Sequence, residues 1–189
     1  MPTRKIVEAG FVYQLKVTLQ DSHPPIWRRI QVSGGTRLAK LHDILQVVMG
    51  WTDSHLHQFI VNGVYIGVPS SEDWTRIENE TQFALYQIVP GEKFKFVYEY
   101  DFGDDWMHNI VVEKMLPPEP GVHYPVCLKG KGACPPEDCG GIYGYYGLLE
   151  ALQNPDHPEH DEMLEWVGGE FDPRAIDLDG INQALRSMR

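Results

Sequence analysis

The sequence predicts an α+β fold, in which a mixed, mostly antiparallel sheet built from hairpins has one packed helix and is followed by a loop-rich C-terminal helical segment. Three observations lead to this prediction. Short segments of alternating apolar residues recur up to residue 116, one apolar stripe at helical spacing interrupts them, and the later residues show mainly helical patterns. The 189 residues suffice for a single domain, with a β-rich core at 10–116 and a helical extension at 117–189.

The first hairpin and the packed helix are expected within residues 11–50. Alternate residues of the first segment are apolar, as in a half-buried strand: Phe11, Tyr13, Leu15, Val17 and Leu19. Pro24 and Pro25 break this strand, and a returning strand is expected at 26–32. Thr36 is the expected N-cap and Gly50 the expected end of a helix with an apolar stripe at Leu38, Leu41, Ile44, Leu45 and Val48.

Further hairpins are expected before residue 116. Asn62-Gly63, at the centre of segment 56–66, is a strong signal for a turn between two strands. Residues 67–80 are polar and predict an exposed excursion, and a short strand is expected at 83–89. Gly103 then lies at the turn between two segments with the alternation of strands.

The proline-rich stretch 117–121 predicts a boundary, because the alternating pattern fades beyond it. Three short helices are expected after it, at 143–152, 159–167 and 179–188. The helical extension is therefore expected to pack on the sheet rather than to extend it.

Composition narrows the class of protein. Twenty-seven acidic and sixteen basic residues give a net charge of −11, which disfavours nucleic acid as a partner, because phosphate binding depends on Lys and Arg. The sequence contains neither an apolar stretch of membrane-spanning length nor the apolar core of a signal peptide, so we expect a cytoplasmic protein without a membrane partner. Three cysteines without a secretion signal predict reduced thiols.

The hairpin around Gly103 contains the leading site candidates, because its turn gathers acidic residues and a histidine: Asp101, Asp104, Asp105 and His108. Convergent carboxylates could hold Mg²⁺ or Mn²⁺, and such an ion could activate water. The alternative is structural: Asp side chains also make tight turns by accepting hydrogen bonds from backbone amides.

Two other sets of residues are candidate metal ligands. His55 and His57 would point to one face of a strand and form half of a transition-metal site. Cys127, Cys134 and Cys139 are spaced more widely than the cysteine pairs of structural zinc sites. The alternative in both sets is burial, as hydrogen-bonded imidazoles and as small apolar thiols.

Two polar stretches complete the candidates. Glu137 and Asp138, in the loop 135–141, either cap the following helix or close over the acidic hairpin. Trp27 and Arg28 could bind an anion or stack on a base, although salt bridges are the alternative in so acidic a chain.

Several of these motifs occur in an order that resembles the plasmid pRiA4b ORF-3-like family. They are PIWRR at 25–29, Leu41-His42, MGW at 49–51, HLHQF at 55–59, YDFGD at 100–104 with Trp106, and PPEDCGG at 135–141. The resemblance extends from about residue 10 to about residue 186. It implies a compact α+β domain of prokaryotes and their mobile elements, and it implies no activity.

We expect a binding or interaction module that recognises a protein or a small ligand through an aromatic face with Trp51, Phe59, Tyr100 and Trp106. The full set of expected binding residues is Trp27, Arg28, Trp51, His57, Tyr100, Trp106, Glu137 and Asp138. The alternative is a metal-dependent hydrolase or nuclease-like enzyme that uses the acidic hairpin. A site-specific recombinase is disfavoured, because the sequence lacks a basic DNA-binding segment.

Overall fold

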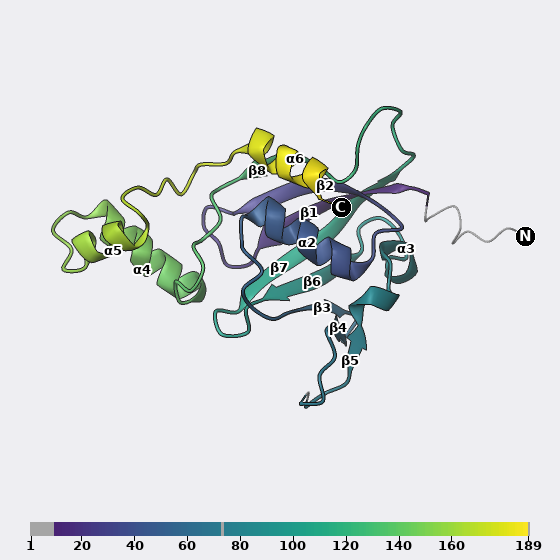
Figure 1. The fold of residues 1–189 in the computed structure, drawn as a ribbon, viewed down its shortest axis with the longest axis horizontal. Coiled ribbons are helices and arrows are strands. Elements are labelled where there is room, and N and C mark those ends of the chain that lie inside the picture. The colour runs from purple at the N-terminus through teal and green to yellow at the C-terminus, as the bar shows by residue number, and fades with distance from the viewer. Residues whose placement is uncertain (1–9, 73, 189) are drawn as a thin grey trace, which may run out of the picture.

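The computed structural model describes residues 10–72 and 74–188, and within them eight strands form one sheet in the order β5-β4-β3-β6-β7-β1-β2-β8 (Figure 1). Neighbouring strands are antiparallel except β4 and β5, which are parallel. The strands are β1 Val12–Leu19, β2 Trp27–Ser33, β3 His57–Val61, β4 Val64–Gly67, β5 Ile77–Asn79, β6 Lys95–Tyr100, β7 Trp106–Leu116 and β8 Val126–Lys131. The predicted α+β class is confirmed.

Helices lie on the sheet and beyond one end of it. Helix α2 lies across the sheet, α6 lies beside α2 and β8, and α4 and α5 form a pair at the far end of the molecule (Figure 1). The helices are α2 Leu38–Met49, the 3₁₀ helix η1 Glu80–Gln82, α3 Leu85–Ile88, α4 Gly141–Gln153, α5 His160–Trp166 and α6 Leu178–Ser187. No helix in the described ranges combines the length and the apolar character needed to cross a membrane.

The core forms where the apolar stripe of α2 meets the sheet. Leu15 and Val17 of β1 are fully buried, as the alternation predicts, and Leu41 and Leu45 of α2 are fully buried in the same cluster. Gly50 ends α2 with φ 112°, a left-handed conformation that glycine adopts without strain.

The turn signals are accurate and the cap is wrong by one residue. Asn62 and Gly63 form the turn between β3 and β4, with φ of 50° and 79°. The N-cap of α2 is Arg37 rather than Thr36, because the backbone oxygen of Thr36 instead accepts a hydrogen bond from Leu85 N at 3.0 Å.

Two predicted segments differ in the structure. Residues 83–89, expected as a strand, contain the helical turn α3, because Gln87 Oε1 accepts a hydrogen bond from Ala84 N at 2.7 Å and closes the turn. The exposed excursion contains β5, which extends the sheet beside β4.

The helical extension also differs from the prediction, because it contributes a strand to the sheet. Strand β8 pairs with β2, so the sheet continues past the proline-rich stretch 117–121. The three later helices lie within two residues of their predicted bounds.

Candidate functional site

A cavity of about 830 Å³ opens between α2, the loop that leads into β3, and η1. We call it the histidine pocket and define it by two sets of lining residues. Its floor is formed by His42, Asp53, His57 and Glu80, and its rim by the exposed apolar residues Leu56, Val68 and Phe102. Its volume falls in the range of about 300–1,000 Å³ that is typical of small-molecule sites.

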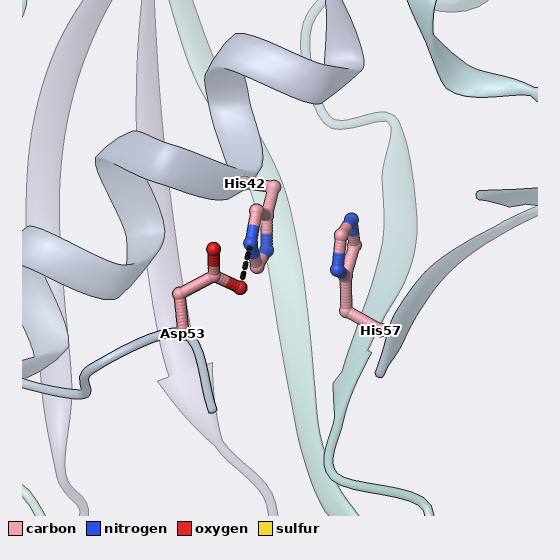
Figure 2. Close-up of side chains that lie close together, drawn as sticks. All are labelled: His42, Asp53 and His57. Carbon is pink, nitrogen blue, oxygen red and sulfur yellow. Dashed lines mark hydrogen bonds and ion pairs between the residues drawn. The ribbon is translucent and has the colours of Figure 1, made fainter. Parts of the chain in front are cut away.

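Two stacked imidazoles form the centre of the floor. The rings of His42 and His57 lie face to face, with centroids 3.4 Å apart and an interplanar angle of 6°. Figure 2 shows His42 between His57 and Asp53, with the helix α2 carrying His42. The stack therefore joins the helical layer to the first residue of β3.

Both ring nitrogens of His42 have partners. Nδ1 lies 2.8 Å from Tyr98 Oη, and Nε2 lies 2.8 Å from Asp53 Oδ1. Gln46 Nε2 donates to the same hydroxyl, and Gln46 Oε1 accepts from Asp53 N. Because the tyrosine hydroxyl accepts from Gln46, it can donate its own proton to Nδ1, and Nε2 then carries the proton that His42 donates to Asp53.

This arrangement keeps His42 neutral. Burial lowers the pKa of His42, and electrostatic interaction with His57 lowers it further, while Asp53 acts in the opposite direction. Burial also raises the pKa of the Tyr98 hydroxyl well above its usual value, so this hydroxyl remains a proton donor.

His57 is held by a second carboxylate. Its Nε2 lies 2.8 Å from Glu80 Oε2, where Glu80 is buried and the side chain of His57 is only 9% exposed. A buried carboxylate is costly without a partner, so this pair satisfies both groups at once. Each imidazole of the stack is thus paired with its own carboxylate.

A second group, which we call the His55 cluster, consists of His55, Asp101, Glu137 and Asp138. His55 Nε2 lies 3.0 Å from Asp138 Oδ1, 3.6 Å from Asp101 Oδ2 and 3.8 Å from Glu137 Oε2. Nε2 is buried and makes no hydrogen bond with another described residue. Three carboxylates therefore surround one ring nitrogen.

The register of the sheet explains why His55 meets Asp101. In the antiparallel pair β3–β6, His57 lies opposite Tyr100, so the residues before His57 run beside those after Tyr100. Asp101 N donates to Leu56 O at 2.8 Å and extends this pairing by one step. The ends of the two strands thus bring the two candidates together.

Residues 135–138 are held beside His55 by hydrogen bonds from the loop that follows α2. Trp51 Nε1 donates to Pro135 O at 3.1 Å, and Thr52 N donates to Glu137 Oε1 at 2.9 Å. Neither Glu137 nor Asp138 caps α4, whose N-cap is Gly140 without a side-chain hydrogen bond. The loop therefore approaches the acidic hairpin, and its two carboxylates do not cap the helix that follows.

The remaining residues of the acidic hairpin do not join the cluster. Asp104 Oδ2 accepts from Gly140 N at 3.1 Å, and Asp105 is exposed at a turn with φ 57°. His108 is fully buried, its Nδ1 lies 3.2 Å from Tyr98 O, and burial lowers its pKa to about 4. The structure therefore brings only Asp101 of this set to His55.

The other candidate ligands lie apart. His55 and His57 belong to different clusters, because His57 turns to the stack and His55 turns to the carboxylates. No metal-ligating group within the described part of the chain includes a cysteine. Burial raises the pKa of all three thiols, to about 12 for Cys139, so they are protonated at neutral pH.

The expected aromatic face is not exposed. Trp51, Phe59, Tyr100 and Trp106 are buried in the core, where ring contacts such as that of Trp51 with Tyr100, at a centroid distance of 5.0 Å, connect them. This corrects the expectation of an accessible aromatic recognition face, because all four side chains are buried in the hydrophobic core.

Trp27 and Arg28 make contacts within the protein. Trp27 is flanked by Lys16 and Arg29, each 5.3 Å from its ring. Arg28 is buried, and it donates to the backbone oxygens of Val48, Trp27 and Lys131. Its donors are therefore directed at the main chain rather than at solvent anions.

Sequence reasoning missed the floor residues His42, Asp53 and Glu80. One signal was available for His42, which lies on the buried stripe of α2 next to Leu41 and Leu45. A polar residue at such a position must be paired, and this requirement points to partners elsewhere in the chain.

Comparison with known proteins identifies relatives over almost the whole chain. The chain is 40% identical to the uncharacterized protein y4hQ of Sinorhizobium fredii (strain NBRC 101917 / NGR234) over 179 residues, which cover 94% of this chain and 92% of that protein. It is also similar to the crystal structure of a protein of unknown function, MM3350 from Methanosarcina mazei Go1. That match has a TM-score of 0.82 and 38% identity, and it covers 89% of this chain and 96% of that chain.

The family comparison agrees with the motifs and with these relatives. Residues 11–180 match the model of the plasmid pRiA4b ORF-3-like protein family. The match begins just before β1 and ends within α6, so it spans the sheet, the histidine pocket and the His55 cluster. The chain belongs to the plasmid pRiA4b ORF-3-like family.

Proposed function

We propose that this protein is a binding module that takes a small organic ligand in the histidine pocket. The observation that carries the proposal is the floor of the pocket, where two imidazoles and two carboxylates are held in one arrangement by hydrogen bonds of 2.8 Å. A floor whose polar groups are fixed before binding loses little entropy when a ligand arrives.

The rim supplies apolar contact beside this polar floor. Leu56, Val68 and Phe102 are large apolar side chains that stay exposed around the cavity. Ligand sites commonly combine apolar walls with a few fixed polar groups. The ligand that fits is therefore a compact molecule with an apolar body and a hydrogen-bonding group.

Charge favours a neutral or cationic ligand. The pocket is lined by the carboxylates of Asp43, Asp53 and Glu80, while its two cationic side chains are engaged by the protein. Arg37 donates to Thr81 O, and Lys40 pairs with Asp43 at 3.6 Å. A polyanion such as nucleic acid would meet net repulsion here.

A fragment screen by saturation-transfer NMR tests the proposal. We expect neutral and cationic heteroaromatic fragments to bind the wild-type protein and to lose about thirtyfold in affinity with Leu56→Ser/Val68→Ser, because the two truncations together remove apolar contact worth about 2 kcal/mol. The matched control, Val122→Ser/Leu128→Ser, removes exposed apolar side chains that do not line the pocket. Failure of all fragments to bind, or equal binding by both variants, would refute the proposal.

A second candidate function, a metal-dependent hydrolase, is favoured by one specific observation. His55 lines the histidine pocket and also faces Asp101, Glu137 and Asp138. An ion in that position could activate water beside a ligand bound in the pocket. Ester, amide and phosphoester hydrolysis assayed with added Mn²⁺ or Zn²⁺ would support this function if Asp101→Asn abolished the activity and Asp105→Asn preserved it.

A further inference from the structure

We infer that the His55 cluster binds a divalent first-row transition-metal ion such as Zn²⁺ or Mn²⁺. This inference goes beyond ligand binding in the histidine pocket and does not depend on it. The donor set is one imidazole nitrogen with carboxylate oxygens of Asp101, Asp138 and Glu137. The ligand atoms of His55, Asp101 and Asp138 all lie within 4.8 Å of one another.

The distances agree with ligands of one ion. Two donor atoms that are each about 2.1 Å from an ion lie about 3.0 Å apart at a right angle and about 3.4 Å apart at the tetrahedral angle. The three carboxylate oxygens lie 3.0, 3.6 and 3.8 Å from His55 Nε2, which spans right-angled to wider arrangements. An ion could therefore be accommodated with small side-chain adjustments.

The state of His55 Nε2 is the second observation. This atom is buried and makes no hydrogen bond with another described residue, although the nearest carboxylate oxygen is only 3.0 Å away. The oxygens thus lie to the side of the line along which the nitrogen would donate a hydrogen bond. An ion placed on that line would be bound by the nitrogen and would have these oxygens as its further ligands.

Two of the carboxylates are oriented by hydrogen bonds from the protein. Asp101 Oδ1 accepts from Gly103 N at 2.9 Å, which leaves Oδ2 facing His55. Glu137 Oε1 accepts from Thr52 N at 2.9 Å. The Tyr100 hydroxyl donates to the same carboxylate, 3.1 Å from Oε1 and 3.3 Å from Oε2, the oxygen that lies 3.8 Å from His55 Nε2. Supporting hydrogen bonds of this kind orient the ligands of protein metal sites.

The neighbouring group His42, Asp53 and His57 also has three potential ligands, yet it suits an ion less well. Its rings are parallel at 6°, so the lone pairs of the two rings cannot converge on one ion without rotation. His42 uses both nitrogens, and His57 uses Nε2, in hydrogen bonds within the protein. The His55 cluster has the nitrogen that remains available.

The donor chemistry selects the class of ion. Imidazole suits Zn²⁺ and its transition-metal neighbours, and carboxylates suit Mn²⁺ as well, whereas Ca²⁺ and Mg²⁺ prefer all-oxygen sites. The side chain of His55 is 28% exposed and that of Asp138 is 70% exposed, so the site is open to solvent. An ion could enter without unfolding of the loop.

Calorimetric titration of the untagged full-length protein, after treatment with a chelator, tests the inference with ZnCl₂, MnCl₂, MgCl₂ and CaCl₂. We expect one Zn²⁺ or Mn²⁺ per chain, and an affinity at least tenfold weaker in Asp101→Asn and Asp138→Asn. Asp105→Asn is the matched control, because Asp105 has the same φ of 57° as Asp138 and does not face His55. Circular dichroism checks that each variant is folded.

Three results would overturn the inference. They are no stoichiometric binding of Zn²⁺ or Mn²⁺, equal affinity in Asp138→Asn and the wild type, and tighter binding of Mg²⁺ or Ca²⁺. Loss of the ion in His57→Gln with retention in Asp138→Asn would move the site to the stacked pair and would also count against it. Failure of the ion to bind leaves fragment binding in the histidine pocket untouched, so these two proposals fail separately, whereas the hydrolase candidate fails together with the ion.

Discussion

The two histidine clusters contain the same kinds of residue and differ in how their nitrogens are used. In the stacked pair, His42 and His57 each donate to or accept from a group of the protein at 2.8 Å. In the His55 cluster, Nε2 has three carboxylates around it and no hydrogen bond to another described residue. A satisfied imidazole fixes the fold around it, and an unsatisfied one is available to a ligand.

Burial distinguishes the nearest carboxylate of His57 from that of His55, although it does not separate the clusters as wholes, because Asp53 beside His42 is exposed and Asp101 beside His55 is buried. Glu80, the partner of His57, is buried, and Asp138, the nearest partner of His55, is mostly exposed. Loss of a buried partner leaves an uncompensated polar group, whereas loss of an exposed one leaves a group that water can solvate. Substitutions of Glu80 and of Asp138 are therefore expected to change stability very differently.

The largest effect is expected from Glu80→Ala, which leaves the buried imidazole of His57 without its partner. We expect a loss of about 3 kcal/mol in the free energy of unfolding, as for other broken buried pairs, measured by urea denaturation. Glu78→Ala, two residues earlier, removes an ion pair with the exposed Arg76 and should cost no more than about 1 kcal/mol. Equal losses in the two variants would contradict the contrast between buried and exposed pairs.

A third histidine sharpens the comparison, because His108 Nε2 is also buried and without a hydrogen bond, yet among the described residues His108 belongs to no group of potential metal ligands. Burial lowers the pKa of His108 to about 4, below the value near 6.5 of an unfolded chain. Its neutral form therefore supports folding fully above pH 6.5, and this support is lost as the pH falls towards 4.

We expect His108 to contribute a loss of about 2 kcal/mol in the free energy of unfolding between pH 7 and pH 5, from about 1.4 kcal/mol per pH unit below 6.5. His108→Leu should be less stable at pH 7 and should lose correspondingly less between the two pH values. The lowered pKa of His42 acts in the same direction and contributes to the slope that remains. An unchanged slope in His108→Leu would show that His108 is not buried in its neutral form.

A smaller effect is expected from Tyr98→Phe, which removes the hydroxyl that links His42 Nδ1 to Gln46 Nε2. We expect a loss of about 1.5 kcal/mol in the free energy of unfolding, because two buried groups each lose a partner. Tyr143→Phe alters an exposed ring and should leave stability unchanged. A neutral Tyr98→Phe would mean that water replaces the hydroxyl, and that the stacked pair is less enclosed than the structure indicates.

The sequence predicts those parts of the fold that depend on local pattern. Leu15 and Val17 are buried as the alternating pattern predicts, Asn62-Gly63 forms the predicted turn, and Gly50 ends the predicted helix. Segment 83–89 was predicted as a strand, whereas the Gln87 side chain closes a helical turn there. Strand β8 was missed because it pairs with β2, about one hundred residues earlier in the chain. Pairings over such distances leave no periodic signal in the strand itself.

The candidate site was likewise predictable only in part. His55, Asp101, Glu137 and Asp138 could each be selected by residue type, but their convergence depends on the register that places His57 opposite Tyr100. His42 was hidden for the opposite reason, since it lies within an apolar stripe that predicts only packing. Residue type therefore predicted which groups could act, and tertiary structure decided which of them meet.

The smallest effect on stability is expected from Asp138→Asn in metal-free protein. The side chain is 70% exposed, and Asn tolerates the left-handed φ of 57° at this position, so the free energy of unfolding should change by less than about 0.5 kcal/mol. The measurement is urea denaturation in the presence of a chelator, beside Glu80→Ala. A loss above about 1.5 kcal/mol would mean that the pair of His55 with Asp138 stabilises the fold, as the stacked pair does. A negligible loss would mean that the carboxylate is retained near His55 without contributing to folding, which is the behaviour expected of a ligand.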